Sequence, residues 1–318
     1  MTKVYIDGSE GTTGLRINER FENRDDIEIL KIDSDKRKDP DERRKFINES
    51  DITFLCLPDA AAIEAVSLID KDNDHTVIID ASTAHRTDAG WAYGLPELGE
   101  EFRNNIKNGK RIAVPGCYAS GFMMSVYPLI KLGVIAADYP VFATALSGYS
   151  GAGKKAIALY ESEDKTEDLY APRLYALSQQ HKHLKEMKAI AGLKREPLFT
   201  PVVDDYYSGM IVTIPLYTDL MANKKTPSEL HKLFSDYYAS EPFIKVMPFG
   251  SEAEVNNFFP ANAYSGRDDA QIYITGNDER ILVSARFDNL GKGASGAAIQ
   301  CMNIVLGCDE AKGLNIQA

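Results

Sequence analysis

The sequence lacks several features that would assign it to common protein classes. No apolar stretch is long enough to span a bilayer, and charged residues and glycines appear from its first residues, so we expect neither a membrane segment nor a signal peptide. The net charge is -11, and no block of lysine and arginine accompanies an aromatic array. Nucleic acid is therefore not an expected partner.

Cysteine is also scarce, with four residues at scattered positions. None forms a C-x-x-C pair, and an H-E-x-x-H motif is absent, so the sequence predicts neither a disulfide framework nor a zinc site, and no other metal site. This usage suits a reducing cytoplasm, where a thiol stays available for chemistry. We expect a cytoplasmic location. The cysteines are Cys56, Cys117, Cys301 and Cys308.

What is present suits a soluble globular protein of two domains. The chain has 318 residues, of which 44% are hydrophobic and 26% charged, which is ample for two buried cores. One stretch organises the rest: a short apolar run, 112–114, ends in Pro-Gly and places Cys117 before an apolar helical pattern. Unpaired N–H groups and the helix dipole stabilise a thiolate there. The alternative is a small buried hydrophobic residue.

The N-terminus predicts the start of a dinucleotide-binding unit. Residues 2–7 have strand composition and lead into Gly8-Ser-Glu-Gly11-Thr12-Thr13-Gly14, after which 15–21 have helical spacing. Such glycines permit a tight turn and close approach of the backbone to a pyrophosphate. The spacing is G-x-x-G-x-x-G rather than G-x-G-x-x-G, so a plain glycine turn is the alternative.

The next predicted strand, 27–32, indicates which cofactor is bound. It ends at Asp33, where a carboxylate for the ribose of NAD is expected. Ser34 and a cationic run that includes Arg37 follow at once, and these suit the additional phosphate of NADP. We therefore expect NADP, unless this is a solvated loop of mixed charge.

Two later segments are candidates for binding an anion. Arg86 follows a predicted strand at 76–80, and ligands bind at the carboxyl ends of strands in open α/β sheets. A strand at 141–147 enters a glycine loop that carries Ser147 and Lys154. A surface arginine and a hinge loop are the respective alternatives.

Two histidines could carry the proton transfers of thiol chemistry. His181 and His183 lie two apart, so they share a face only on an extended segment, and we expect them to precede a helix that starts near Leu184. We favour His181 slightly over His183, and the choice stays open.

The remaining segments predict the fold class. Short buried strands alternate with helices up to Cys117, which is typical of a doubly wound α/β sheet. Beyond it, strands at 211–217, 244–247, 271–275 and 280–287 have few helices between them. They indicate an α+β domain with a mixed, mostly antiparallel sheet, one face of which a second subunit commonly covers.

Several motifs occur together along the chain: GSEGTTG (8–14), YGLPEL (93–98), VPGCYAS (114–120), SGYSGAGK (147–154), the two histidines and NLGKGASGAAIQCMN (289–303). Together they resemble N-acetyl-gamma-glutamyl-phosphate reductase, particularly its shorter type, over nearly the whole chain. The wider superfamily includes aspartate-semialdehyde and glyceraldehyde-3-phosphate dehydrogenases. One departure is Ala-Val-Pro before Gly116, where many relatives have Asn-Pro.

The resemblance implies a Rossmann NADP-binding domain of residues 1–117 and 290–318, and an inserted catalytic and subunit-contact domain of residues 118–289. A homodimer or homotetramer is expected. Cys117 is implied as the nucleophile, with His181 or His183 in acid–base catalysis. The implied cofactor contacts are Gly8, Gly11, Thr12, Thr13, Gly14, Ser34, Arg37, Asn289 and Gly293, and the implied substrate contacts are Arg86, Ser147 and Lys154.

The implied reaction is the NADPH-dependent reduction of N-acetyl-gamma-glutamyl phosphate, a small anionic acyl phosphate, to its semialdehyde and phosphate through a cysteine thioester, in arginine biosynthesis. Reduction of another acyl phosphate, such as aspartyl phosphate, is an alternative. A non-catalytic nucleotide-sensing protein is another, but the intact Pro-Gly-Cys turn argues against it. A cysteine hydrolase would leave the glycine turn at Gly8 without a purpose.

Overall fold

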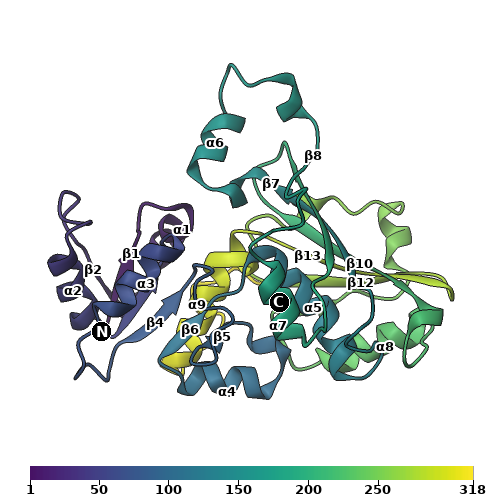
Figure 1. Cartoon of the computed structure of the whole chain (residues 1–318), viewed down its shortest axis with the longest axis horizontal. Helices are drawn as coiled ribbons and strands as arrows, with labels where there is room; N and C mark the ends of the chain where they lie inside the picture. Colours follow the sequence, from purple (N-terminus) through teal and green to yellow (C-terminus); the bar gives the residue numbers. More distant parts are fainter. Residues whose placement is uncertain (318) are drawn as a thin grey trace. The chain divides into compact units, whose positions relative to one another are not determined.

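The computed structural model describes residues 1–317, which divide into two compact units. The first unit is Met1–Gly116 with Ala294–Leu314, and the second is Cys117–Gly293 with the described tail from Asn315 (Figure 1).

The first unit has a six-stranded parallel sheet in the order β2-β1-β3-β4-β6-β5. The strand order reverses between β1 and β3, which is the switch point where doubly wound sheets bind ligands. Its strands are β1 (Thr2–Asp7), β2 (Ile27–Leu30), β3 (Ile52–Leu55), β4 (Val77–Asp80), β5 (Ala92–Tyr93) and β6 (Arg111–Ala113). Its helices are α1 (Thr12–Phe21), α2 (Pro40–Glu49), α3 (Asp59–Ser67), α4 (Glu100–Asn108) and α9 (Gly296–Leu306).

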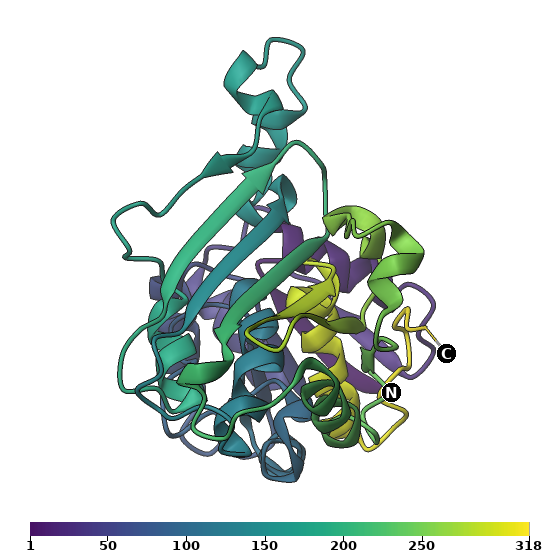
Figure 2. The same ribbon diagram turned by 90° about the vertical axis from the view of Figure 1, so that its right-hand side faces the viewer.

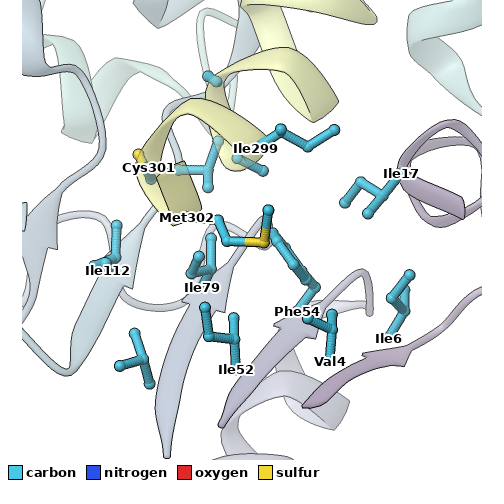
Figure 3. Packing of buried hydrophobic residues seen from close by; sticks show 14 of the residues in the cluster. Val4, Ile6, Ile17, Ile52, Phe54, Ile79, Ile112, Ile299, Cys301 and Met302 are labelled. Carbon is cyan, nitrogen blue, oxygen red and sulfur yellow. The ribbon is translucent and has the colours of Figure 1, made fainter. Parts of the chain in front are cut away.

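Helices cover both faces of this sheet. On one face, Ile17 of α1 and Met302 of α9 pack with Phe54 of β3 (Figure 3). On the other, Ile47 of α2 and Ala62 of α3 join a second apolar cluster. The strands are buried on both sides, which explains their continuous apolar sequences. The predicted doubly wound architecture is confirmed.

The second unit has a seven-stranded mixed sheet in the order β11-β12-β13-β10-β7-β9-β8. Four of its neighbouring pairs are antiparallel, and β7–β9 and β11–β12 are parallel, so the prediction of a mixed, mostly antiparallel sheet is confirmed. Its strands are β7 (Phe142–Gly148), β8 (Arg173–Leu174), β9 (Leu198–Asp204), β10 (Met210–Tyr217), β11 (Ile244–Val246), β12 (Ala270–Gly276) and β13 (Arg280–Phe287). Its helices are α5 (Cys117–Lys131), α6 (Lys154–Tyr160), α7 (Leu184–Ala191) and α8 (Pro227–Tyr237).

Helix α5 packs closely on one face of this sheet through Gly121. A Cβ atom at Gly121 would lie 2.6 Å from Val212 on β10 and 2.7 Å from Phe287 on β13, so only glycine allows the approach. The segment that carries α6 extends as an arm beyond the ends of the long strands (Figure 2). The close contact at Gly121 ties the first turn of α5 to the middle of the sheet.

Candidate active site

Cys117 is the first residue of α5, directly after the Pro115-Gly116 turn. Its side chain is half-buried, and the first turn of the helix carries no acidic residue. The first N–H groups of a helix have no acceptor within it, and they form the positive end of the helix dipole. Cys117 therefore occupies a position that favours the thiolate over the thiol.

A glycine turn packs directly against Cys117. A Cβ atom at Gly293 would lie 2.9 Å from the Cβ of Cys117 and 3.1 Å from the carbonyl oxygen of Asp288. Residues 291–295 form a single π-helical turn, a distortion often found at functional sites. Gly293 was assigned to the cofactor pocket by resemblance, and the structure places it beside the cysteine.

Aromatic and imidazole rings surround Tyr118, the next residue after Cys117. The ring centroids of His181 and His183 lie 5.7 and 5.9 Å from that of Tyr118, and 4.6 Å from each other. Tyr175 and Phe199 complete the group of rings. As predicted, α7 begins at Leu184, directly after the histidines. The fold thus brings both candidate histidines next to the residue that follows Cys117.

Two tyrosine hydroxyls in this group are hydrogen-bonded to each other. The hydroxyl of Tyr175 donates to that of Tyr118 over 2.7 Å. Burial raises the pKa of both phenols well above the usual value, and the nearby Cys117 raises both further; the side chain of Ser147 acts in the opposite direction on Tyr118. Both tyrosines therefore remain protonated at neutral pH. The proton of Tyr175 is donated to Tyr118, so of the two it is the O–H of Tyr118 that can donate to a further group.

Asn289 anchors the glycine loop that follows β7. Its Nδ2 donates to Ser150 Oγ over 3.0 Å, and its Oδ1 accepts from the N–H of Gly209 over 2.8 Å. A Cβ atom at Gly151 would lie 3.1 Å from Nδ2, so the small residue lets the loop approach the amide. Sequence reasoning assigned Asn289 to the nicotinamide pocket and missed this contact.

Backbone N–H groups of the same loop already donate hydrogen bonds within the protein. The N–H groups of Gly148, Tyr149 and Ser150 donate to the carbonyl groups of Gly209, Tyr206 and Tyr207. Ser147 Oγ donates to the carbonyl group of Gly148. These N–H groups cannot hold an anion without breaking a hydrogen bond, so charge at this loop comes from Lys154, which is exposed at the start of α6.

In the first unit, the glycine turn between β1 and α1 has the shape that a pyrophosphate requires. Gly8 adopts a φ of +87°, and a Cβ atom there would lie 2.3 Å from the carbonyl oxygen of Cys56. A Cβ atom at Gly14 would lie 2.5 Å from the carbonyl oxygen of Gly8. Gly11 precedes α1 and no side chain caps the helix, so the N–H groups of Thr12 and Thr13 suit a bound phosphate. The turn fits a dinucleotide.

The loop after β2 forms an ion pair with this turn. Arg37 forms an ion pair with Glu10 of the glycine turn, and Lys36 pairs with Glu42 over 3.4 Å. Ser34 lies in the same loop and is exposed. The ion pair holds Arg37, which the sequence predicts to bind the additional phosphate of NADP, next to the glycine turn.

A buried ion pair lies at the end of β1 and was missed by sequence reasoning. Arg43 of α2 donates through Nε and Nη2 to Asp7 Oδ2 over 3.0 and 2.9 Å. Burial raises the pKa of Asp7, and Arg43 offsets only part of that effect. The pair fixes α2 against the strand that leads into Gly8. The cap Asp39 and Pro40 at the first helical position were the sequence signals for this helix.

Arg86 is buried and braces the segment before the cysteine. Its Nε donates to the carbonyl group of Val114 over 2.8 Å, and its Nη2 donates to that of Ala81 over 3.1 Å. The neighbouring His85 bonds to Asp80 over 2.7 Å and stacks on Trp91. Arg86 thus has a visible structural contact, and its substrate role stays a prediction.

Among the described residues, no helix is long and apolar enough to cross a membrane. Within residues 1–317 we also find no group of three histidine, cysteine or acidic side chains that could hold a metal ion.

Comparison with known proteins gives two family matches. Residues 2–108 match the NAD-binding domain of semialdehyde dehydrogenases, and residues 117–289 match their dimerisation domain. N-acetyl-gamma-glutamyl-phosphate reductase 2 from Nostoc sp. is 45% identical, with 98% of this chain and 99% of that protein aligned. This chain belongs to the N-acetyl-gamma-glutamyl-phosphate reductase family.

Another reductase and two solved structures are also similar to this chain over nearly its whole length. The reductase from Burkholderia cenocepacia is 40% identical over 97% of this chain and 98% of its own. Aspartate-semialdehyde dehydrogenases from Francisella tularensis and Vibrio cholerae have TM-scores of 0.73 and 0.70, at 18% and 14% identity. Each alignment covers 96% of this chain, and 100% and 98% of the respective structures. These structures share the fold of this chain.

Proposed function

We propose that the chain reduces N-acetyl-gamma-glutamyl phosphate to N-acetyl-glutamate semialdehyde and inorganic phosphate, with NADPH, as a step of arginine biosynthesis. The observation that carries this proposal is the position of Cys117 at the start of α5, beside Gly293 and next to the ring group of Tyr118. The full-length likeness to reductases of that name supports the substrate. A cytoplasmic location belongs to the same proposal.

Cys117 performs the first chemical step. Its thiolate attacks the acyl carbon, the bond to the phosphate oxygen breaks, and inorganic phosphate leaves while a thioester forms. When bound, NADPH would supply the hydride that reduces the thioester carbon, which becomes a thiohemiacetal on Cys117. Collapse of the resulting thiohemiacetal breaks its carbon–sulfur bond and restores the thiolate on Cys117.

The residues around Tyr118 would transfer the proton and stabilise the oxyanion that develops during the reaction. An oxyanion in the acyl group needs donors that are already oriented, and a histidine supplies or removes a proton. His181 and His183 are the candidates, and the hydroxyl of Tyr118, which accepts from Tyr175, adds an O–H donor to the same group of rings. The choice between the two histidines stays open in this mechanism.

The first unit holds the cofactor. The N–H groups at the start of α1 would bind the pyrophosphate of NADPH, and the glycines permit the approach. Arg37 and Ser34 would bind the phosphate that distinguishes NADP from NAD. Arg37 already contacts the glycine turn through Glu10, which supports the preference for NADP.

The net charge of the chain is -11, so an anionic substrate needs nearby cations to bind. Lys154 is exposed and flanks the loop that Asn289 anchors, so it would bind the phosphate or the carboxylate, together with Ser147. Arg86 would have the same role. These cations would offset the repulsion between an anionic substrate and an acidic protein.

The outward face of the second sheet supports assembly as a homodimer or homotetramer. Thr144, Thr200, Thr213 and Ser284 lie in one row across it, and two of these pairs are hydrogen-bonded. Leu146 and Leu282 are exposed in the neighbouring rows. A sheet face with exposed leucines suits contact with a second copy, in keeping with the matched dimerisation domain. Sedimentation equilibrium measures the subunit number.

One assay tests the proposed reaction in reverse. Phosphate and NADP are supplied with N-acetylglutamate semialdehyde, and NADPH formation is followed, with aspartate semialdehyde as the competing substrate. We expect phosphate-dependent NADPH formation with the acetylated substrate and a much lower kcat/KM with the other. Preference for aspartate semialdehyde, or activity without phosphate, would contradict the proposal.

A further inference from the structure

The side chain of Gln179 takes the place of a strand at the edge of β9. Strand β8 pairs with β9 at Val202 and Val203, and Phe199 lies beyond the end of β8. Gln179 Nε2 donates to the carbonyl group of Phe199 over 2.7 Å, and its Oε1 accepts from the N–H of Phe199 over 3.0 Å. One carboxamide thus reproduces both hydrogen bonds that a neighbouring strand would make there.

The backbone that delivers Gln179 to this edge is held in an unfavourable conformation. Ala176 has a φ of 52° and Gln179 a φ of 56°, in the left-handed region that such residues seldom adopt. The N–H of Gln179 donates to the carbonyl group of Ala176 over 2.9 Å and closes the turn. Strained backbone persists where its surroundings hold it, and the hydrogen bonds to Phe199 do so here.

His181 follows this turn by two residues, and its orientation is defined by hydrogen bonding. Its ring packs edge-on against Phe199, with centroids 5.2 Å apart, and lies beside Tyr118. The main-chain N–H of His183 donates to His181 Nδ1 over 3.1 Å. Since Nδ1 accepts a hydrogen bond, a neutral His181 carries its proton on Nε2.

We propose that Gln179 is a positioning residue that holds His181 as the Nε2–H tautomer in the ring group beside Cys117. His181 then acts as a hydrogen-bond donor to the acyl oxygen rather than as the ring that takes up a proton, because protonation of Nδ1 would break the bond from His183. The effect on turnover rests on the proposed function. The tautomer of His181 in the resting protein does not rest on that function. Nor does the dependence of this tautomer on Gln179.

The test compares three variants of the full chain. Gln179→Asn keeps a residue that tolerates left-handed backbone, but it is one methylene too short to reach both groups of Phe199. Gln179→Glu keeps the acceptor and loses the donor. Gln180→Asn is the matched control, because Gln180 is the adjacent glutamine and is exposed like Gln179. Histidine is labelled with ¹⁵N, the ring signals of His181 are assigned with His181→Asn, and kcat and KM are measured alongside.

We expect the wild type and Gln180→Asn to show an unprotonated Nδ1 and a protonated Nε2 at His181. In Gln179→Asn the ring should exchange between tautomers, and kcat should fall about tenfold, the scale expected for a misplaced group, with KM changed less than twofold. Gln179→Glu should give an intermediate loss, which serves as the second measurement if the Asn variant does not fold.

A protonated Nδ1 in the wild type would overturn the proposal. A second result would also overturn it: Gln179→Asn or Gln179→Glu lowers the unfolding temperature but leaves the ring signals of His181 and kcat unchanged. Gln179 would then have only a structural role. If the wild type lacks reductase activity but Gln179→Asn still alters the His181 signals, the proposed function fails and the positioning role of Gln179 stands.

Discussion

Replacing Gly293 with alanine should displace Cys117 and so tests how closely the reactive thiol is held. The new Cβ would lie 2.9 Å from the Cβ of Cys117, whereas unstrained carbon atoms pack about 3.5 Å apart or more. One side must therefore move by about 0.6 Å. The other neighbours, the Asp288 carbonyl oxygen at 3.1 Å and the Phe287 ring at 3.3 Å, leave little room to share that movement.

The backbone of Gly293 does not lie in the left-handed region, so alanine brings only this steric conflict. Overpacking of this kind costs about 1–3 kcal/mol, which corresponds to an unfolding midpoint lowered by several degrees. A displacement near 1 Å at a reacting group costs up to about a hundredfold in rate. We expect kcat for Gly293→Ala to fall about ten- to a hundredfold.

The assay measures kcat, the rate of thiol alkylation by iodoacetamide and the unfolding midpoint. Gly90→Ala is the matched control, since a Cβ there approaches only the side chain of Asp88, at 3.3 Å. Wild-type kcat and alkylation rate in Gly293→Ala would refute the argument that this glycine holds Cys117 in place.

Three further predictions concern chemistry, the loop and stability. Cys117→Ser should lower turnover by several orders of magnitude while NADP affinity is retained; Cys308→Ser is the control, and substantial activity would exclude the thioester. Asn289→Ala should raise KM for the acyl phosphate more than tenfold and change the NADP Kd little, because its amide anchors Ser150; the reverse pattern would return Asn289 to the cofactor pocket. Hydrogen bonds from Arg24 hold the pKa of Asp26 well below its usual 3.8, so the stability that they add is fully present above pH 3.8 and is lost as the pH falls from there toward the lowered pKa of the folded state. Asp26→Asn should cost about 1–2 kcal/mol at pH 7 and steadily less as the pH falls below 3.8, as measured by unfolding midpoints; equal losses at pH 7 and pH 2 would disprove the linkage.

Local signals were sufficient for much of the fold. Strand β1 and strand β13 were predicted with the bounds that the structure shows, and α7 begins at the predicted residue. These elements follow from side-chain periodicity and from turn residues, which act over a few neighbours. Helix α2 was missed although Asp39 and Pro40 marked its start, because its charged sequence hides the apolar spacing.

Strand β9 was missed for a different reason. Pro201 lies within it, and proline usually argues against an interior strand. In the sheet, Pro201 uses its carbonyl oxygen to accept from Tyr175 and needs no N–H at that position. Whether strand β9 can hold a proline depends on where the neighbouring strand ends. The spacing of residues in the sequence does not show that position.

The sequence alone determined the order of the motifs, the two kinds of sheet and the position of Cys117 at a helix start, because each depends on residues close together in the chain. Only the tertiary structure decided what those residues contact. Asn289 reaches Ser150 across 139 positions, and Gly293 contacts Cys117 across an even longer separation in the chain. Such contacts arise when strands and helices pack, and the free energy of that packing depends on many distant side chains at once.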